Sequence, residues 1–317
     1  MLVVKAAGVR KFGGPVQPLD VEERDLRDDE VLIEVRAAGV ANWDEIVRTG
    51  GWDVGIAPPM ALGVEASGVV RAVGSAVTRF RPADAVLTHP LPLRHQGAWA
   101  ERLVAAEDRV ATKPERMSWE VAGIFPVPAL TASQLVQQLA VHPGEFVLIH
   151  GGGGVTGGVI VAVAASLGAR VIATAGPAST ERLRGYGAEA VLDYHDPGWP
   201  QEVQRLTAAR LPAAINAVRG AANSLVPLVG DGGRLATITS DPPEAQRGIS
   251  VTNFYVAPDA EALERAASTF AANGLTIPVA RRYGLDTASA ALAAALGELR
   301  GSGVVINPHT PLVAPSP

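Results

Sequence analysis

The spacing of hydrophobic positions changes along the chain and divides it into stretches of different predicted structure. Over residues 1–115, apolar and polar residues alternate in short runs separated by glycine and proline, which is typical of half-buried β-strands. The runs expected to be strands are Val31–Ala37, Gly63–Val73 and Asp84–Leu87. The proline-rich segment His89–Pro92 is expected to be an exposed loop. This pattern predicts a β-rich first domain.

Longer apolar segments begin at Trp119. The segment Trp119–Leu139 has helical length and is expected to break at Pro126 and Pro128. From Phe146 onward, β-rich runs alternate with segments of helical length, which predicts a parallel sheet with right-handed crossovers. The later strands of this sheet are expected at Ala190–Asp193, Ala213–Ala217, Arg234–Ile238 and Ile249–Val256.

The last part of the chain is expected to hold two helices and one short strand. The helices are expected at Asp259–Ala272 and Thr287–Leu299. Val304–Ile306 is too short to stand alone as a strand, so we expect it to pair back into the first domain. The tail His309–Pro317 has no periodicity and is expected to be disordered. The predicted domains are therefore residues 1–117 with 258–317, and residues 118–257.

The most informative stretch contains a strand, a glycine cluster, a helix and a second strand. Phe146–Ile149 is a short apolar run that suits a buried parallel strand. The cluster GGGGVTGG follows, and then come the helical segment Thr156–Leu167 and the β-rich run Arg170–Thr174. This order is the βαβ unit of a doubly wound parallel sheet, and it predicts an α/β fold of the Rossmann type.

The glycine cluster has the spacing G-x-G-x-x-G at Gly152, Gly154 and Gly157. The first glycine permits a tight turn, the second lets the backbone approach a pyrophosphate, and the third lets the helix lie against the strand. The N–H groups of the helix's first turn would then face the phosphates. Two other interpretations are a glycine-rich connection without a ligand, and a membrane span over Val155–Ala175, which Arg170 opposes. We predict a dinucleotide site.

The choice of dinucleotide depends on the end of the second strand. An acidic residue there would bind the ribose hydroxyls of NAD, but the chain continues with Ala175 and Gly176. Hydroxyl and basic side chains, which suit the 2′-phosphate of NADPH, follow at Ser179, Thr180, Arg182, Arg184 and Tyr194. The alternative is that these residues cap and solvate the next helix, where Glu181 would oppose a phosphate. NADPH is the predicted cofactor.

Composition limits the partners of the protein. The 317 residues carry a formal net charge of −5 and no cysteine. The charge favours neither nucleic acid nor an anionic membrane as a partner, and without cysteine the chain has neither disulfides nor a cysteine nucleophile. The N-terminal apolar run is too short for a signal peptide, so a cytoplasmic location is expected.

Short motifs occur in one order through almost the whole chain. They include FGGP at Phe12–Pro15, GAWAE at Gly97–Glu101, LTA at Leu130–Ala132, the glycine cluster, and GGRL at Gly232–Leu235. In order and spacing, the chain resembles the zinc-independent medium-chain dehydrogenase/reductase superfamily, in its quinone oxidoreductase (ζ-crystallin-like) branch. The resemblance implies a β-rich GroES-like catalytic domain beside the Rossmann domain. It also implies NADPH-dependent reduction of a quinone or a polarised C=C bond, and a homodimer.

The resemblance implies roles for individual residues as well. Gly154, Val155 and Thr156 match the backbone phosphate cradle, and Tyr194 matches a tyrosine beside the adenosine phosphate. The residues that match positions near the nicotinamide are Thr131, Thr239, Ser240 and Phe254–Val256.

The chain departs from the family pattern at several places. Zinc-binding relatives carry a cysteine and a histidine where this chain has Ala41-Asn42 and Val64, so no catalytic zinc is expected. His89 and His95 are the remaining metal candidates, and both are expected to be solvated surface histidines. Trp52 replaces a tyrosine that many relatives carry, and the asparagine of the family's G-V-N motif is missing or displaced to Asn42.

The favoured hypothesis is hydride transfer from NADPH to a small apolar carbonyl compound or quinone. The candidates for stabilising the developing enolate oxygen are Asn42, a backbone N–H and the nicotinamide ribose hydroxyl, and the proton is expected from solvent or from Tyr255. The alternatives are that Asn42 caps the helix Trp43–Arg48 and that Tyr255 serves packing. The loops Gly50–Pro59 and Thr88–Gln96 carry few charges, which favours a neutral substrate. A second hypothesis is an NADPH-binding protein without reductase turnover, in a biosynthetic cyclisation or a structural role.

Overall fold

The structure is a computed structural model that describes residues 3–297, 299 and 301–309. The chain divides into two compact units, Met1–Val127 with Pro258–Pro317 (unit 1) and Pro128–Ala257 (unit 2). The tail expected to be disordered falls mostly on residues 310–317, which lie outside the described residues. The predicted domains stay a prediction, because they also give each chain segment a role in catalysis or in cofactor binding.

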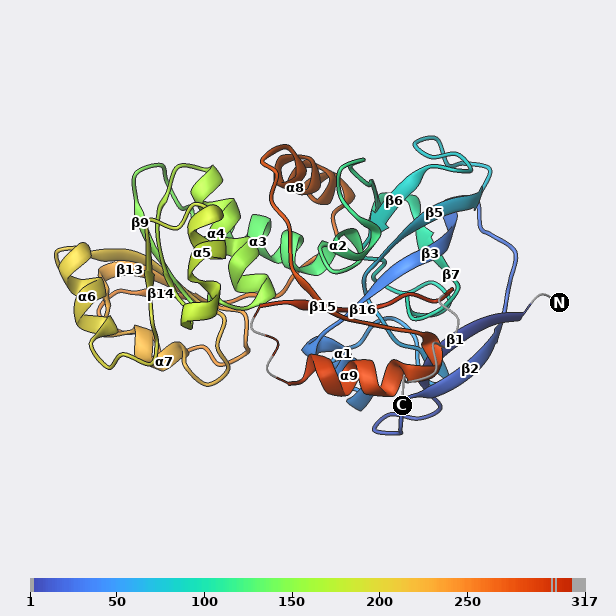
Figure 1. Ribbon diagram of the computed structural model, residues 1–317, viewed down its shortest axis with the longest axis horizontal. Coiled ribbons are helices and arrows are strands. Elements are labelled where there is room, and N and C mark those ends of the chain that lie inside the picture. The colour runs from blue at the N-terminus through green and yellow to red at the C-terminus, as the bar shows by residue number, and fades with distance from the viewer. Residues whose placement is uncertain (1–2, 298, 300, 310–317) are drawn as a thin grey trace. The chain divides into compact units, whose positions relative to one another are not determined.

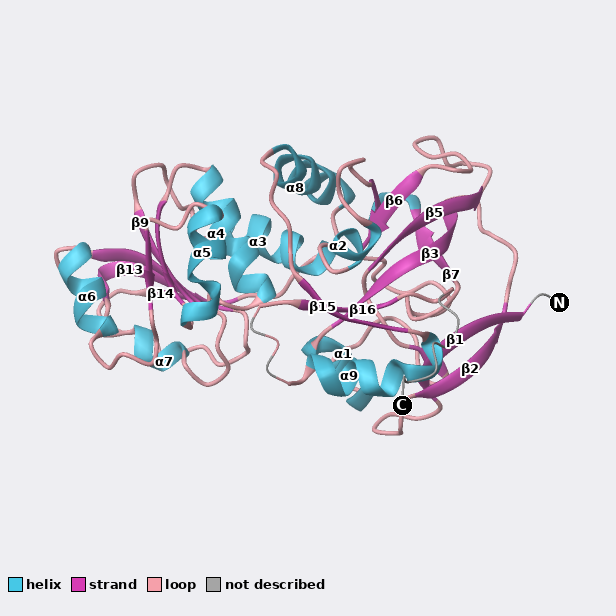
Figure 2. Ribbon diagram, in the orientation of Figure 1, coloured by secondary structure: helices cyan, strands magenta, loops and turns pink. Residues whose placement is uncertain are grey.

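Unit 1 is rich in strands (Figures 1 and 2). In its described residues the strands form one sheet of order β2-β1-β4 and one of order β15-β16-β3-β5-β6-β8, with β7 also paired to β3. The elements are β1 (Val3–Val9), β2 (Gln17–Glu22), β3 (Glu30–Val40), α1 (Asn42–Thr49), β4 (Met60–Ala61), β5 (Ala66–Val73), β6 (Ala85–Thr88), β7 (Arg102–Ala106), η1 (Glu107–Arg109), β8 (Val110–Thr112), α2 (Trp119–Gly123), α8 (Ala260–Ala272), β15 (Val279–Tyr283), η3 (Leu285–Thr287), α9 (Ala288–Ala295) and β16 (Gly303–Ile306).

The last strand of unit 1 joins its larger sheet, as the sequence predicts. β16 runs antiparallel to β3, with Val304 opposite Val40 and Ile306 opposite Ala38. All four residues of β16 are buried, so this strand contributes core as well as backbone hydrogen bonds. The two separate chain segments that make up unit 1 therefore contribute strands to one sheet.

Unit 2 contains the doubly wound sheet. Its six strands are parallel in the order β11-β10-β9-β12-β13-β14, which is the Rossmann order 3-2-1-4-5-6 when the strands are numbered along the chain. The elements are α3 (Pro126–Gln138, which begins in unit 1), β9 (Phe146–His150), α4 (Val155–Ser166), β10 (Arg170–Thr174), η2 (Pro177–Ser179), α5 (Thr180–Gly185), β11 (Ala190–Leu192), α6 (Trp199–Leu206), β12 (Leu211–Asn216), α7 (Ala222–Leu225), β13 (Val229–Thr237) and β14 (Ser250–Asn253).

Helices cover both faces of this sheet. In Figure 2, α4 and α5 lie on one side of the strands, and α6 and α7 lie on the other. Val203 of α6 and Leu225 of α7 share a buried cluster with Leu148 of β9 and Ile172 of β10. Most of α4 is buried, which explains why its sequence is apolar all round and not along one stripe.

One prediction about proline was confirmed in part and one was wrong. The helical segment does break at Pro126, because α2 ends at Gly123 and α3 begins at Pro126, whereas Pro128 lies in the first turn of α3, where a missing N–H removes no intrahelical bond. The segment His89–Pro92 is not an exposed loop, since every residue of it except Pro92 is buried. The apolar side chains of this segment are buried, and its one polar side chain, His89, donates a hydrogen bond to the backbone carbonyl of Val64.

The structure also bears on the alternative that Val155–Ala175 spans a membrane. Within residues 3–297, 299 and 301–309, no helix has both the length and the apolar character needed to cross a bilayer. The stretch divides into the helix α4 and the strand β10, as the βαβ prediction requires.

Candidate active site

The glycine turn between β9 and α4 is shaped by close backbone contacts. A Cβ atom added at Gly157 would lie 2.2 Å from the carbonyl oxygen of Gly151. Gly151 itself has φ +87°, a conformation that side chains strongly disfavour. These two positions require glycine, and together they let α4 begin directly over the end of β9.

The N-terminus of α4 offers an anion site. Gly154 is its N-cap, no side chain caps the helix, and the first turn carries no acidic residue. The first-turn N–H groups, including those of Val155 and Thr156, have no acceptor within the helix. Gly154 is exposed, and a Cβ added there would meet a single atom, the Gly151 oxygen at 3.5 Å. Open space, free donors and the helix dipole fit the pyrophosphate of a dinucleotide.

No carboxylate stands at the end of the second strand. β10 ends at Thr174, whose buried hydroxyl accepts a hydrogen bond from Gly151 N at 3.0 Å and lies 2.8 Å from His150 Nδ1. Thr174 therefore connects the second strand to the glycine turn. The next residues, Ala175 and Gly176, offer no acceptor side chain for ribose hydroxyls.

Arg182 and Ser179 lie together against the glycine turn. Arg182 Nη2 donates to the carbonyl oxygen of Gly153 at 2.7 Å and lies 3.2 Å from Ser179 Oγ. The guanidinium also lies over the ring of Tyr186, 5.5 Å from its centroid. Ser179 is 4% exposed, and Thr180 opens α5 beside it. Arg182 thus holds α5 against the turn.

A second group of predicted residues gathers after β13 and β14. Asp241 Oδ1 accepts hydrogen bonds from the hydroxyls of Thr237 and Thr239, each at 2.6 Å. Asn216 at the end of β12 donates to Thr239 Oγ1 at 3.0 Å. Although partial burial opposes it, the two threonine hydroxyls hold the pKa of Asp241 below its ordinary value. Asp241 organises this loop; the sequence analysis missed it because the four side chains come together only through the parallel register.

Tyr255 lies beside the same loop. Its hydroxyl is 3.0 Å from Asn253 Nδ2 and 3.4 Å from Ser240 Oγ, and the side chain is 70% exposed. The neighbouring Phe254 is buried. The structure thus brings Ser240 and Tyr255 together, and exposure of this extent does not fit a packing role for Tyr255. Thr131 is separate from this loop in the chain, in the middle of α3, and is also buried.

In unit 1, Asn42 does not cap its helix. Ala41 is the N-cap of α1 and Asn42 is the first, exposed helical residue, because the Asp44 side chain does the capping. Asp44 Oδ2 accepts from Ala41 N at 2.8 Å. Complete burial raises the pKa of Asp44 to about 8, against the opposing effect of the N–H groups of Ala41 and Gly63. The position of Asp44 in the first turn was anticipated, but its burial was not.

Glu65 and His89 are ionisable side chains that are also buried in unit 1. Glu65 Oε2 accepts from Val127 N at 2.9 Å, and burial, with a smaller contribution from nearby Asp44, raises its pKa. His89 is 1% exposed, so its assignment to solvated surface was wrong. Its Nδ1 donates to the Val64 carbonyl at 2.6 Å, and burial lowers its pKa to about 4. Among the described residues, no three His, Asp or Glu side chains are placed to hold a metal ion.

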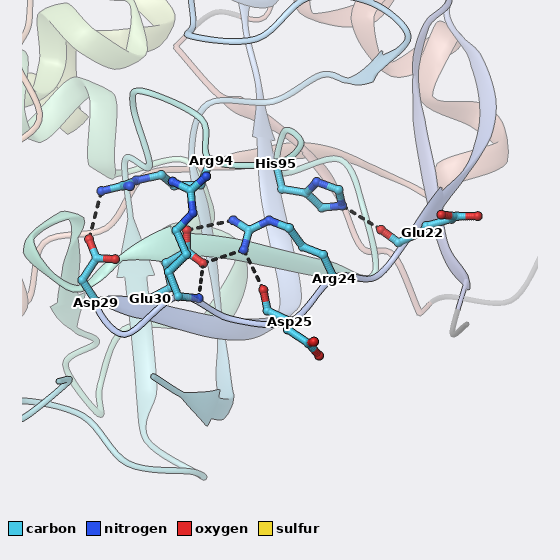
Figure 3. A network of polar contacts seen from close by, with 8 residues as sticks. Glu22, Arg24, Asp25, Asp29, Glu30, Arg94 and His95 are labelled. Atoms are coloured by element: carbon cyan, nitrogen blue, oxygen red, sulfur yellow. Dashed lines mark hydrogen bonds and ion pairs between the residues drawn. The ribbon is translucent and has the colours of Figure 1, made fainter. Parts of the chain in front are cut away.

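The loop Thr88–Gln96 is held by polar contacts from the last residue of β2 and from the segment between β2 and β3 (Figure 3). Arg94 donates to Asp29 Oδ2 at 3.0 Å, and His95 Nε2 donates to the Glu22 carbonyl at 2.7 Å. That segment is fixed in turn by Glu30, which is fully buried. Arg24 binds both carboxylate oxygens of Glu30, at 2.7 and 2.8 Å, and holds the pKa of this carboxyl below its usual range. His95 is therefore a structural tether.

Comparison with known proteins agrees with this geometry. The family model of the alcohol dehydrogenase GroES-like domain matches residues 27–115. Quinone oxidoreductase of Sus scrofa is 32% identical over 208 residues, which cover 64% of this chain and 62% of that protein. The structure of the quinone oxidoreductase from Coxiella burnetii is 25% identical with a TM-score of 0.81, covering 96% of this chain and 99% of its own. An NAD-dependent alcohol dehydrogenase structure is 28% identical with a TM-score of 0.83, covering 96% and 99%.

The predicted resemblance to the medium-chain dehydrogenase/reductase superfamily, in its quinone oxidoreductase branch, is confirmed by this family model and by these relatives. The predicted fold, a Rossmann-type sheet with a β-rich GroES-like domain, is confirmed. The chain spans 62% of the length of the pig and human quinone oxidoreductases that it matches. The roles given to individual site residues stay predictions.

Proposed function

We propose that this protein binds NADPH in unit 2 and transfers a hydride from it to a quinone or an activated C=C bond, without zinc. The observation that carries the proposal is the uncapped N-terminus of α4 over the glycine turn, next to a β10 end that bears no carboxylate. In a quinone oxidoreductase-like chain, this combination favours a dinucleotide with a 2′-phosphate over NAD.

The chain's own residues have distinct tasks in this proposal. NADPH, when bound, supplies the hydride from its nicotinamide ring. Gly154, Val155 and Thr156 hold the pyrophosphate through their backbone N–H groups. Thr239 and Ser240, together with Thr131 and Phe254, flank the nicotinamide.

Two side chains are proposed to assist hydride transfer and the protonation that follows it. Tyr255 delivers a proton from its exposed hydroxyl, which Asn253 and Ser240 orient. Asn42, exposed at the start of α1, donates to the developing enolate oxygen. The substrate is small, neutral and apolar, and the working protein is a homodimer.

The test is a titration of the purified protein with NADPH and NADH, followed by assay of cofactor oxidation with a panel of quinones and enones. We expect NADPH to bind more tightly and to be oxidised by at least one acceptor. Tight NADPH binding without turnover on the whole panel would contradict the reductase proposal and favour a biosynthetic or structural role. Failure to bind either cofactor would contradict the dinucleotide site itself.

A further inference from the structure

Asp193 and His195 form a hydrogen-bonded pair on the turn after β11. Asp193 Oδ1 accepts from the backbone N–H of His195 at 3.0 Å and lies 2.6 Å from ring Nδ1. These two contacts hold the pKa of the Asp193 carboxyl below its ordinary value. Since a carboxylate only accepts, the Nδ1 proton is committed to Asp193, and Nε2 is the ring nitrogen available to a ligand.

The His195 ring lies next to the end of β10. The backbone N–H of Ala175 donates to the Leu192 carbonyl at 3.0 Å, which holds the ends of β10 and β11 side by side. A Cβ added at Gly176 would lie 3.7 Å from His195 Cε1 and 3.8 Å from Tyr194 Cε1. The two rings are themselves 4.0 Å apart between centroids. Both rings therefore lie against Gly176.

Gly176 stands close to the place of the missing ribose-binding carboxylate. In NAD-binding chains of this fold, an acidic residue just beyond the second strand accepts the ribose hydroxyls. Here that place is bordered by an imidazole and a phenol instead. A group attached to the ribose 2′-oxygen would therefore meet the rings of His195 and Tyr194.

The side chains of α5 and η2 are less available for this task. Arg182 donates to the Gly153 carbonyl within the glycine turn, and Ser179 is 4% exposed. By contrast, the His195 side chain is 62% exposed and Tyr194 is 51% exposed. The side-chain atoms nearest to a Cβ at Gly176 are therefore those of two exposed residues on the β11 turn.

We propose that His195 recognises the 2′-phosphate of NADPH through Nε2, in its protonated form, while Asp193 fixes the ring through Nδ1. A protonated imidazole supplies both a donor and a positive charge, which a phosphate needs and a ribose hydroxyl does not. This inference rests on the proposed function and names the residue that sets its cofactor preference. Asp193 acts through His195 and is a positioning residue.

The ionisable groups around His195 are few. On its own turn they are Asp193, the Tyr194 hydroxyl and Asp196, whose Oδ1 accepts from Gly198 N at 2.8 Å. The adjacent end of β10, Ala175-Gly176, brings no ionisable side chain. Helix α5 brings the exposed Glu181 in its first turn. These carboxylates repel a phosphate unless a positive charge stands between them and it.

The experiment measures the dissociation constants of NADPH and NADH for the wild type and for His195→Asn, by equilibrium titration. We expect His195→Asn to weaken NADPH about tenfold, the size of one charge-assisted hydrogen bond at an exposed site, and to leave NADH unchanged.

Two matched variants complete the test. His142→Asn changes an exposed histidine that precedes the N-terminal end of β9, whereas His195 follows the C-terminal end of β11, and this variant should alter neither constant. Arg182→Gln should weaken both cofactors together, because it loosens the glycine turn that both use.

The outcomes separate this inference from the function on which it rests. A wild type that prefers NADPH, with a His195→Asn variant that keeps the preference, would overturn the inference alone. An equal loss of NADPH and NADH in His195→Asn would also overturn it, because His195 would then be structural. A wild type that binds neither cofactor would remove the proposed function and this inference together.

Discussion

Asp44 is a buried acid whose protonation is coupled to folding. Its side chain is fully buried, and its pKa rises from 3.8 to about 8. Below pH 3.8 both the folded and the unfolded chain hold the proton, so the contribution to stability is fully present there. As pH rises towards 8, the unfolded chain releases the proton and the folded chain keeps it. Stability then falls by about 1.4 kcal/mol per pH unit, until the folded acid also ionises.

Asp44→Asn should remove this penalty. An amide oxygen can still accept from Ala41 N, and it has no charge to desolvate. We expect the variant to gain stability over the wild type by an amount that grows from near zero at pH 4 to on the order of 3–5 kcal/mol at pH 8. Urea denaturation at several pH values measures this difference. A difference that does not change with pH would contradict the assigned ionisation.

At the scale of one element, α4 depends on how closely it approaches the glycine turn. The helix has few charged or capping contacts, so its placement rests on burial and on the short distance between Gly157 and Gly151. The same short distance places the N-terminal N–H groups of α4 at the glycine turn, beside the exposed Gly154. Packing and the proposed phosphate site are therefore two results of one contact.

Gly157→Ala should displace α4. The added Cβ would lie 2.2 Å from the Gly151 oxygen, so the backbone must shift. We expect a loss of about 2–4 kcal/mol in the stability of unit 2, as for overpacking, and loss of NADPH binding.

The matched control is Gly185→Ala, at the end of α5. A Cβ there meets no atom within 4 Å, so this variant should match or exceed the wild type by up to about 1 kcal/mol. Thermal unfolding of both variants, with and without NADPH, measures their stability and their ability to bind the cofactor. Equal behaviour of the two alanine variants would contradict the role given to the Gly157–Gly151 contact.

Patterns within one element were predictable from the sequence. The spacing of apolar residues over Phe146–Thr174 predicted the strand, the helix and the second strand. It could do so because the apolar residues that pack each element into the core recur with the period of that element. Asp259 was recognised near the start of its helix, and it caps α8 by accepting from Ala262 N. The sequence could not predict which side chains are buried by segments that are distant along the chain. His89 looked like a loop histidine, and nothing local indicates that Val64 accepts its hydrogen bond.

Part of the candidate site was hidden for the same reason. Asp241 follows a strand in an ordinary polar loop, and its partners Asn216 and Thr237 come from β12 and β13. His195 was overlooked because its importance depends on the pairing of β10 with β11, which places it against Gly176. The carboxyl ends of parallel strands meet at one edge, so side chains just beyond each strand offer the signal that would have found both.

At the scale of the whole molecule, unit 1 is built from two separated parts of the chain. Its central strand β3 has β5 on one edge and β16 on the other, although β16 begins only at Gly303. Unit 2 comes from one continuous segment between them. The sheet of unit 1 is therefore complete only when the last strand is in place.

Val305→Asp should show how far unit 1 depends on β16. Val305 is fully buried opposite Gly39, so an aspartate there would be a desolvated charge. We expect a loss of at least about 4 kcal/mol, or failure to fold. Arg281→Asp places the same side chain at an exposed position of the neighbouring β15 and should cost less than about 1 kcal/mol. Circular dichroism during denaturation compares the two, and similar losses would contradict the dependence on β16.

The late position of β16 has a consequence for synthesis on the ribosome. Because unit 2 is continuous, its sheet can form while the following residues are still being translated. Over the same interval β3 keeps an unpaired edge, with the backbone of Ala38–Val40 open to any other strand. A growing chain of this protein is therefore most vulnerable to aggregation after unit 2 has folded, and this vulnerability ends when β16 leaves the exit tunnel.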